Sequence, residues 1–546
     1  MSFGKILIKK YWPLLILILI FGWLFFNLLS SHMLLQKPDG LYSGGSTWGD
    51  LPFHLSLVNS FVNRGNLAFQ EHPVYIGSPL RYPFLTDLIA AGLIKIGVSL
   101  RVSLIVPSWI FLILLVAAIY FLTLKISKSR IGAFLAPFIF FFNGAIYSLR
   151  YFWQDFKLSG MGFWKFLGNM SKEYGHLADH HIEFSNIIAD YILPQRAVIL
   201  GLLLGVIVVY LLWLYWENKD RKKLLWAGVV LGILPLVHTH TFMALCFVAL
   251  FLALINLWQD RKNFKKIIVN WLYFGIPLLI VALPSILWLF PKSSPGFFKF
   301  GFGWMKDTES FSSFWFKNLG VYLILFIVAF IFSRPKVRSF YLAFFGLFII
   351  TNLFIFQPNI YDNMKIMLWW FLLSIILAAE FFQYLRNKIG YKSFLIIIPI
   401  FILLIPTGFL SVLRESYVSW QLFSNEDIAL ANFVKDQTPS NAIFLTSDKH
   451  NNPVPCLAGR RIVMGYRGWL WTHGIDYRQR EADVMGMYQG SSKSLSLIAD
   501  YKVSYALIEM DKIYDFGINS QFFFEHFPVI YQSQNYILFK INQNKV

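Results

Sequence analysis

The sequence predicts a polytopic α-helical membrane protein whose last part is a small α/β domain. Hydrophobic residues make up 57% of the 546 residues and charged residues 14%, and the mean hydropathy is +0.57. These values are typical of chains that cross a bilayer many times. The Lys and Arg residues, which give a net charge of +19, are spread over short loops between apolar runs. They therefore indicate membrane topology and argue against a nucleic-acid partner.

The first apolar run covers residues 12–31 and follows Lys5, Lys9 and Lys10. It is longer than the core of a signal peptide, and no small-residue cleavage site accompanies it. We therefore expect a retained anchor whose N-terminus is cytoplasmic.

The segment 46–61, which follows this anchor, contains the leading functional candidate, Asp50. Apolar residues recur in it at helical spacing, which predicts an amphipathic helix along the membrane interface. A carboxylate at a membrane surface is a functional candidate. Asp50 could instead cap the helix through its side chain, and the two roles are compatible.

The segment 83–99 decides the topology. It contains Asp87 and Lys95 and is barely long enough to span a bilayer. If it spanned, the basic loops that follow would lie outside, against the positive-inside rule, so we expect a second interfacial helix. The chain then makes about eleven crossings. These are expected at residues 12–31, 102–124, 131–149, 192–216, 224–237, 243–258, 267–290, 319–332, 340–356, 366–385 and 393–413.

From about residue 414 the sequence alternates between short apolar strands and amphipathic helices. This pattern predicts an α/β domain at 414–546, outside the cytoplasm because the last crossing ends there. The transmembrane domain would occupy residues 1–413, with its first outer loop at 32–101. The cytoplasmic loops are short and basic, and the chain has no nucleotide-binding fingerprint, so the energy for any reaction must arrive with the substrate.

This order of elements resembles the GT-C superfamily of lipid-carrier-dependent glycosyltransferases. Residues 81–108 are similar to the segment after the catalytic loop in protein mannosyltransferase-like and aminoarabinose transferase-like members. The resemblance implies that Asp50 is the catalytic carboxylate. It also implies transfer from a polyprenyl-phosphate-linked sugar at the outer face of the membrane. The chain departs from the family in having no acidic pair of the DxD or ExD type at Asp50.

A sugar on polyprenyl phosphate already carries its leaving group, so the protein needs a base for the acceptor hydroxyl and a cation for the phosphate. Asp50 is the predicted general base. Arg81, Arg196 and Lys365 are the candidate cations, although each has an alternative role as a snorkelling interfacial residue. The acceptor would be a lipid, a glycan or a protein.

Histidines supply the other polar candidates. His54 lies on the Asp50 helix, and His238 and His240 stand between two short apolar runs, where a sunken turn would line a substrate cavity. The sequence does not require a cofactor, and binding of a divalent ion such as Mg, Mn or Zn is kept as an alternative. Its predicted ligands are His180, His181 and Glu183. The alternative is a set of hydrogen-bonded histidines around a wet pocket.

In the C-terminal part, Trp469, Trp471 and His473 lie in one loop region and are predicted to bind sugar. Indole faces with polar neighbours suit sugar stacking, and Trp is equally an interfacial anchor.

Two other functions stay open: a transporter or flippase of lipid-linked sugars, and a non-catalytic scaffold that keeps the GT-C form. The absence of an inverted repeat in the sequence argues against a transporter. We expect an integral protein of a prokaryotic plasma membrane whose active site is extracytoplasmic.

Overall fold

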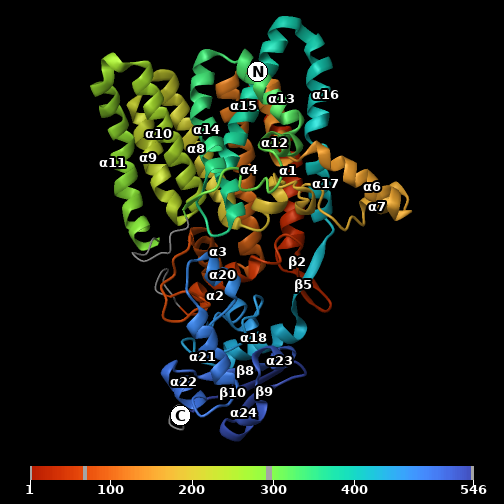
Figure 1. Ribbon diagram of the computed structural model, residues 1–546, viewed down its shortest axis with the longest axis vertical. Helices are drawn as coiled ribbons and strands as arrows, with labels where there is room; N and C mark the ends of the chain where they lie inside the picture. The colour runs from red at the N-terminus through yellow and green to blue at the C-terminus, as the bar shows by residue number, and fades with distance from the viewer. Residues whose placement is uncertain (1–2, 65–70, 290–297, 543–546) are drawn as a thin grey trace. The chain divides into compact units, whose positions relative to one another are not determined.

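The computed structural model describes residues 3–64, 71–289 and 298–542 (Figure 1). Contacts divide the described residues into two compact units. Unit 1 takes its residues from 3–29, 108–288 and 298–418, and unit 2 from 30–64, 71–107, 289 and 419–542. The loop after the first helix therefore groups with the C-terminal part of the chain. The predicted separation into domains at residue 413 remains a prediction.

Unit 1 is a bundle of apolar helices. Two of its helices, α1 (Phe3–His32) and α4 (Leu100–Ser127), also contain residues of unit 2. The others are α5 (Arg130–Phe141), α6 (Leu149–Ser159), α7 (Phe163–Leu167), α8 (Arg196–Asn218), α9 (Arg221–Ile233), α10 (Thr239–Gln259), α11 (Phe264–Leu289), α12 (Phe311–Leu319), α13 (Val321–Phe332), α14 (Pro335–Leu353), α15 (Met364–Ile389), α16 (Phe394–Leu404) and α17 (Pro406–Glu415). Two short strands, β3 (Lys299–Phe300) and β4 (Phe354–Ile355), pair antiparallel.

The centre of the bundle is α15. It is buried from Met364 to Phe382, and α5, α10, α13 and α14 pack against it. In contrast, α11 exposes Ile280 and Leu287. Only 22% of the most apolar 18 residues of this segment are buried, against 94% in the segment that contains α15. The exposed face of α11 is therefore suited to contact lipid tails.

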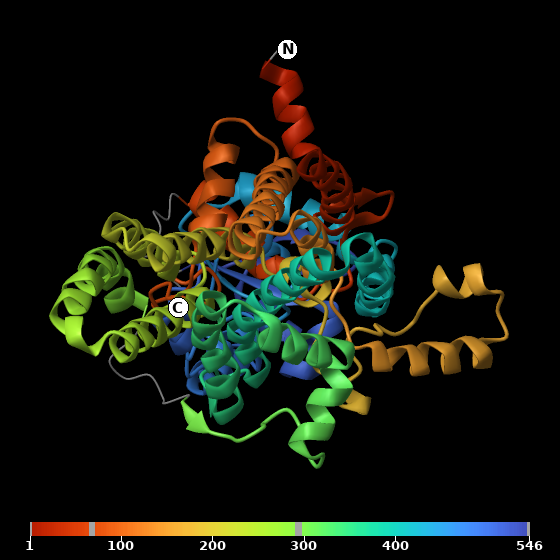
Figure 2. The same cartoon turned by 90° about the horizontal axis from the view of Figure 1, so that it is seen from above.

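Helices α6 and α7 extend sideways from the rest of unit 1 (Figures 1 and 2). They expose Trp153, Leu158 and Trp164, whereas Phe152 and Phe166 are buried in a small cluster. Exposed tryptophans on a short amphipathic helix favour a position at the membrane surface.

Seven helices of the described chain are long and apolar enough to cross a membrane, or up to nine if two bent pairs each count as one span. The chain is therefore an integral membrane protein. The predicted eleven crossings are not confirmed, because four of them fall on helices of only 11 to 13 residues: α5, α9, α13 and α16. At ~1.5 Å per residue such a helix is about 16–20 Å long, less than the ~30 Å of a hydrocarbon core.

Unit 2 contains two sheets. In the first, β1 (Leu35–Lys37), β2 (Gly40–Gly44) and β5 (Ser419–Ser424) are antiparallel. The second has the order β7-β6-β8-β10-β9, with β6 parallel to β7 and β8, and β10 antiparallel to β8 and β9. Its strands are β6 (Ile443–Leu445), β7 (Arg461–Ile462), β8 (Tyr505–Glu509), β9 (Val529–Gln532) and β10 (Tyr536–Lys540).

The helices of unit 2 come from the segment between α1 and α4 and from the part of the chain after residue 418. Helix α3 has 11 residues and is too short to span, as predicted for this segment. The helices are α2 (Leu51–Asn63), α3 (Leu85–Lys95), α18 (Asn425–Gln437), α19 (Pro453–Cys456), α20 (Arg467–Thr472), α21 (Arg478–Tyr488), α22 (Ser494–Asp500), α23 (Ile513–Phe516) and α24 (Ser520–His526).

Close backbone contacts hold α2 against the C-terminal segment. The Asn59 side chain donates to the Cys456 carbonyl at 2.7 Å. A Cβ on Gly459 would stand 2.4 Å from the Asn59 carbonyl oxygen, and the φ of Gly459 is +66°. Both facts require glycine at this position. Asp50 thus stands on a helix that is fixed at its far end.

The predicted sidedness can be tested by cysteine labelling in intact cells. In a background where Cys246 and Cys456 are replaced by Ala, Asn387→Cys at the end of α15 should be shielded from an impermeant thiol reagent, because the neighbouring loop is basic. Gln521→Cys on α24 should react. The reverse pattern would contradict the predicted topology, and permeabilised cells, in which both sites should react, provide the control.

Candidate functional site

Asp50 lies at the N-terminal end of α2 and is partly exposed. Its backbone carbonyl accepts the N–H groups of Phe53 and His54 at 3.1 and 3.4 Å. Within this described turn its carboxylate does not accept a capping hydrogen bond, although Asp50 occupies the N-cap position. The capping role considered from the sequence is therefore not the one this carboxylate has in the structure.

His54 stands one turn after Asp50 on the same side of α2, and it is held by Asp87 of α3. The distance from Nδ1 of His54 to Oδ2 of Asp87 is 2.9 Å, and the two side chains are 2% and 1% exposed. Asp87 lies in the first turn of α3, where the helix dipole favours a carboxylate. When His54 Nδ1–H donates to this carboxylate, Nε2 remains as the acceptor on the other side of the ring.

Three aromatic rings from two other segments of unit 2 surround the ring of Phe53, which follows Asp50 in α2. Its ring centroid is 5.0 Å from Tyr82, 5.3 Å from Trp469 and 4.9 Å from His473. The loop before α3 supplies Tyr82, and α20 with the residue after it supplies the other two. The predicted residues Trp469 and His473 thus lie beside the Asp50 helix.

A second ring contact joins the turn before α2 to the C-terminal segment. Trp48 and His450 have ring centroids 4.0 Å apart, and Trp48 Nε1 donates to the Gln421 carbonyl at 3.1 Å. Two other predicted residues lie outside these clusters: Trp471 is 51% exposed, and Arg81 is exposed in the loop before α3. The site is therefore mainly aromatic, with Asp50 and His54 as its polar groups.

His72 and His473 form a buried pair. Nε2 of His72 lies 3.1 Å from Nδ1 of His473, and the Val74 N–H donates to Nδ1 of His72 at 3.4 Å. His72 therefore carries its proton on Nε2 and donates it to His473, whose own proton is then on Nε2. Burial lowers the pKa of His72 well below its ordinary value and that of His473 to about 3. Both rings are neutral at pH 7.

Unit 1 contains a separate polar cluster, at the start of α10 and α15. The His238 and His240 rings are 5.1 Å apart. Asp362 lies 3.8 Å from His240 Nε2 and 2.7 Å from the Lys365 ammonium, and Lys365 is 4% exposed. The predicted residues His238, His240 and Lys365 are therefore brought together, and His240 and Lys365 share the Asp362 carboxylate.

Arg196, the first residue of α8, is also buried, with 1% of its side chain exposed. Its Nε donates to the Ser108 hydroxyl at 3.4 Å. Neither Arg196 nor Lys365 is a surface cation, so the snorkelling alternative does not describe their positions in the structure.

Two membrane proteins of known structure share this architecture. The oligosaccharyltransferase of Archaeoglobus fulgidus in its apo form has a TM-score of 0.56 at 12% identity, over 98% of this chain and 75% of that one. Its complex with a tethered acceptor peptide containing the NVT sequon has a TM-score of 0.54 at 12% identity, over 99% of this chain and 75% of that one. ArnT from Cupriavidus metallidurans bound to undecaprenyl phosphate has a TM-score of 0.53 at 8% identity, over 96% of this chain and 97% of that one. The chain has the GT-C fold.

No protein-family model and no curated protein matches the sequence. At 8–12% identity this structural likeness establishes the fold alone.

The predicted metal ligands do not converge on one point of the GT-C fold. His180 stacks on Tyr151 with ring centroids 3.9 Å apart, and the Glu183 carboxylate accepts from His176 Nε2 at 3.0 Å. His181 has a positive φ of 55°. Within the described residues no group of three His, Cys, Asp or Glu side chains could hold a metal ion. These three residues as placed do not fit a divalent ion, and metal dependence remains a prediction.

The same loop contains acidic residues that the sequence did not point to. Asp190 lies in a π-helical turn at Ile188–Ile192, 4.0 Å from His176 Nδ1. Burial raises the pKa of Asp190 and of Glu173, and the hydrogen bond to Glu183 raises the pKa of His176. A π-turn often marks a functional segment, but it has no sequence pattern by which it could have been found.

Acid should destabilise unit 2 through the His72–His473 pair. Because folding lowers both pKa values below the ordinary 6.5, stability is complete above about pH 6.5 and falls as the pH drops toward 3. We expect the unfolding midpoint of the wild type to fall more steeply between pH 6.5 and 4 than that of the double variant His72→Phe/His473→Phe. Equal slopes in a thermal unfolding series would show that the pair does not titrate with folding.

Proposed function

We propose that this chain transfers a sugar from a polyprenyl-phosphate-linked donor to an acceptor hydroxyl, with Asp50 as the general base. The observation that carries the proposal is the position of the Asp50 carboxylate. It is partly exposed, it does not cap its helix, and it stands one turn from the buried His54–Asp87 pair. The GT-C fold of two membrane transferases supports the same class of reaction.

The proposed reaction needs one proton transfer and one substitution. Asp50 removes the proton of the acceptor hydroxyl, and the oxygen attacks the anomeric carbon. The bond from that carbon to the phosphate oxygen breaks, and polyprenyl phosphate leaves with the electron pair. His54, which Asp87 orients through Nδ1, presents Nε2 to a sugar hydroxyl. The ring of Tyr82, which is partly exposed, packs on the apolar face of the sugar, and the buried ring of Trp469 supports this surface through Phe53.

Within unit 1 we propose Lys365 as a ligand for a lipid phosphate. The ammonium is buried and held by Asp362, so binding of a phosphate oxygen would add a second anionic partner without exposing the charge to water. Arg196 is the second candidate. That ArnT binds undecaprenyl phosphate supports a lipid phosphate as ligand for this fold.

We further propose an outer-face reaction at a prokaryotic plasma membrane, with a lipid, glycan or protein as acceptor. The oligosaccharyltransferase was captured with an acceptor peptide, so a protein acceptor is compatible with the fold.

The proposal is tested by supplying donors directly. Purified protein in nanodiscs is incubated with a panel of polyprenyl-phosphate sugars and candidate acceptors, and released polyprenyl phosphate is measured by mass spectrometry. We expect release from one donor class in the presence of an acceptor. A protein that binds such donors but never cleaves them would contradict the proposal and favour a transporter or a scaffold.

The histidines at the start of α10 should contribute to turnover. We expect His238→Ala and His240→Ala each to slow transfer about tenfold, because each removes a polar group beside the Lys365–Asp362 pair. Steady-state kinetics with the identified donor measures the effect, and Thr239→Ala, between the two positions, is the control. Unchanged kinetics in both histidine variants would remove them from the site.

A further inference from the structure

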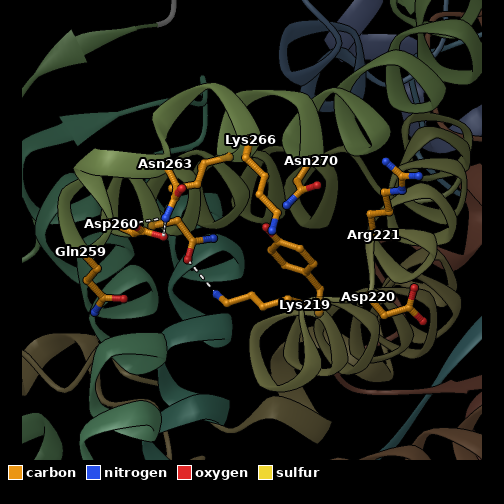
Figure 3. Close-up of a pocket in the computed structure, with 11 residues that line it drawn as sticks. Lys219, Asp220, Arg221, Gln259, Asp260, Asn263, Lys266 and Asn270 are labelled. Atoms are coloured by element: carbon orange, nitrogen blue, oxygen red, sulfur yellow. Dashed lines mark hydrogen bonds between the residues drawn. The ribbon is translucent and has the colours of Figure 1, made fainter.

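A polar pocket lies at the opposite end of α10 from His238 and His240. It has a volume of about 570 Å³ and is formed by the end of α8, the start of α9 and the turn between α10 and α11. Lys219, Arg221 and Lys266 supply its cations, and Asp220 and Asp260 its acids. Figure 3 shows Lys266 reaching down from α11 and Lys219 reaching across from the end of α8.

The two acids are engaged by their own turns. Asp220 is the N-cap of α9, and its carboxylate accepts the Lys222 N–H at 3.0 Å. Both oxygens of Asp260 accept from the Asn263 amide, at 3.0 and 3.1 Å (Figure 3). Neither acid makes a described ion pair with Lys266 or Arg221. An anion in the pocket would therefore meet cations whose charge is only partly balanced.

Asn256 supplies an independent sign of a missing ligand. It lines the pocket and is 5% exposed. Its Oδ1 accepts from the Lys219 ammonium at 3.1 Å, which fixes the amide orientation because an ammonium cannot accept a hydrogen bond. Its Nδ2 is buried and has no acceptor among the described residues. A buried N–H₂ group of this kind requires an acceptor oxygen.

The surroundings place the pocket at the level of lipid headgroups. Trp226 on α9 and Trp258 on α10 are 57% and 68% exposed, as in the aromatic belt of a membrane protein. The exposed apolar face of α11 begins beside the pocket, with Ile268 and Leu272. The basic loops at this end favour the cytoplasmic side.

We propose that this pocket binds the phosphate group of an anionic membrane lipid. The phosphate oxygens accept from Asn256 Nδ2 and pair with Lys219 and Lys266, and the acyl chains lie along the exposed face of α11. Basic pockets between membrane helices at the cytoplasmic surface bind lipid headgroups in this way. The pocket is separate from the Lys365 cluster, and its occupancy does not depend on the transfer reaction.

Native mass spectrometry of the full chain in detergent, with dioleoyl phosphatidylglycerol as probe, tests the proposal. Lys266→Glu and Asn256→Asp each place a negative charge at the proposed phosphate position. Each should weaken binding about tenfold or more, the effect of one lost charge-assisted contact and a new repulsion. The matched control is Lys262→Glu, an exposed charge reversal in the same turn that does not line the pocket. It should change binding less than about twofold. Thermal melting and gel filtration verify that every variant is folded.

Two comparisons separate the sources of the phosphate. Phosphatidylcholine should bind weakly, and inorganic phosphate should displace phosphatidylglycerol only at millimolar concentrations. Inorganic phosphate that binds as tightly as the lipid would overturn the lipid assignment in favour of a soluble phosphate compound. Equal losses in Lys262→Glu and Lys266→Glu would show general surface attraction and overturn the pocket itself, as would no binding of phosphatidylglycerol to the wild type.

Discussion

Replacing Asp50 by Asn should reduce sugar transfer about a hundredfold or more, the scale expected when a positioned general base is removed. Asn keeps the size of the side chain but cannot take the proton of the acceptor hydroxyl. Folding should be unaffected, because Asn is as good a residue as Asp at the N-cap position that Asp50 occupies. Donor binding should also persist, since the proposed phosphate ligands are other residues.

The matched control is Asp39→Asn in the turn between β1 and β2. Asp39 is an exposed acid of the same loop, and its carboxylate accepts from the Tyr42 hydroxyl. We expect wild-type transfer from this variant in the assay used for Asp50→Asn. If Asp50→Asn also transfers at near the wild-type rate, Asp50 is not the base, and the catalytic carboxylate has to be sought in the loop that contains Asp179 and Glu183.

Removing Asp87 should have the largest effect on stability. Asp87→Ala leaves the buried Nδ1–H of His54 without this acceptor, and an unsatisfied buried donor of this kind costs about 1–3 kcal/mol. We expect a large drop in the denaturant midpoint of the detergent-solubilised protein, along with loss of transfer. Asp87→Asn, which can still accept a hydrogen bond from Nδ1, should retain most of the stability.

A double replacement distinguishes the loss of stability caused by an unpaired histidine from the loss caused by disturbed packing. His54→Phe/Asp87→Leu removes both polar groups, so its stability should lie well above that of Asp87→Ala, although transfer remains low. If the double variant and Asp87→Ala were equally unstable, the cost would come from packing in general and not from an unpaired histidine.

The sequence was sufficient to predict the membrane class and the short α3, because apolar periodicity and length are local properties. The GT-C fold was expected from the resemblance to that superfamily, which the structural comparison bears out. The sequence also predicted a helix containing His54, but α2 begins one residue after Asp50 and is buried from Leu51 to Phe61, so the expected amphipathic interfacial helix was wrong. Of the two histidines predicted at a turn, His238 precedes α10 and His240 lies in its first turn. The count of crossings was not confirmed, since α5, α9, α13 and α16 each have only 11 to 13 residues. The composition of an apolar run does not fix where its helix begins and ends.

The partners of the site residues were not predictable because they depend on contacts between distant parts of the chain. Asp87 entered the sequence argument only through topology, yet it lies 2.9 Å from His54, 33 residues earlier. His72 and His473 are 401 residues apart. The pairing of β2 with β5 brings residues 40–44 to 419–424, and no local pattern reveals such a pairing.

The central claim, that this chain itself breaks the bond between the sugar and the phosphate, is tested most directly in sealed proteoliposomes. Wild type and Asp50→Asn are reconstituted with the donor identified in the panel and an acceptor. Released polyprenyl phosphate and the transbilayer position of the intact donor are then measured together by mass spectrometry and by chemical labelling of outer-leaflet lipid. We predict release by the wild type, at least about a hundredfold less by Asp50→Asn, and no movement of intact donor in either. Movement of intact donor across the bilayer without release of polyprenyl phosphate would contradict the account.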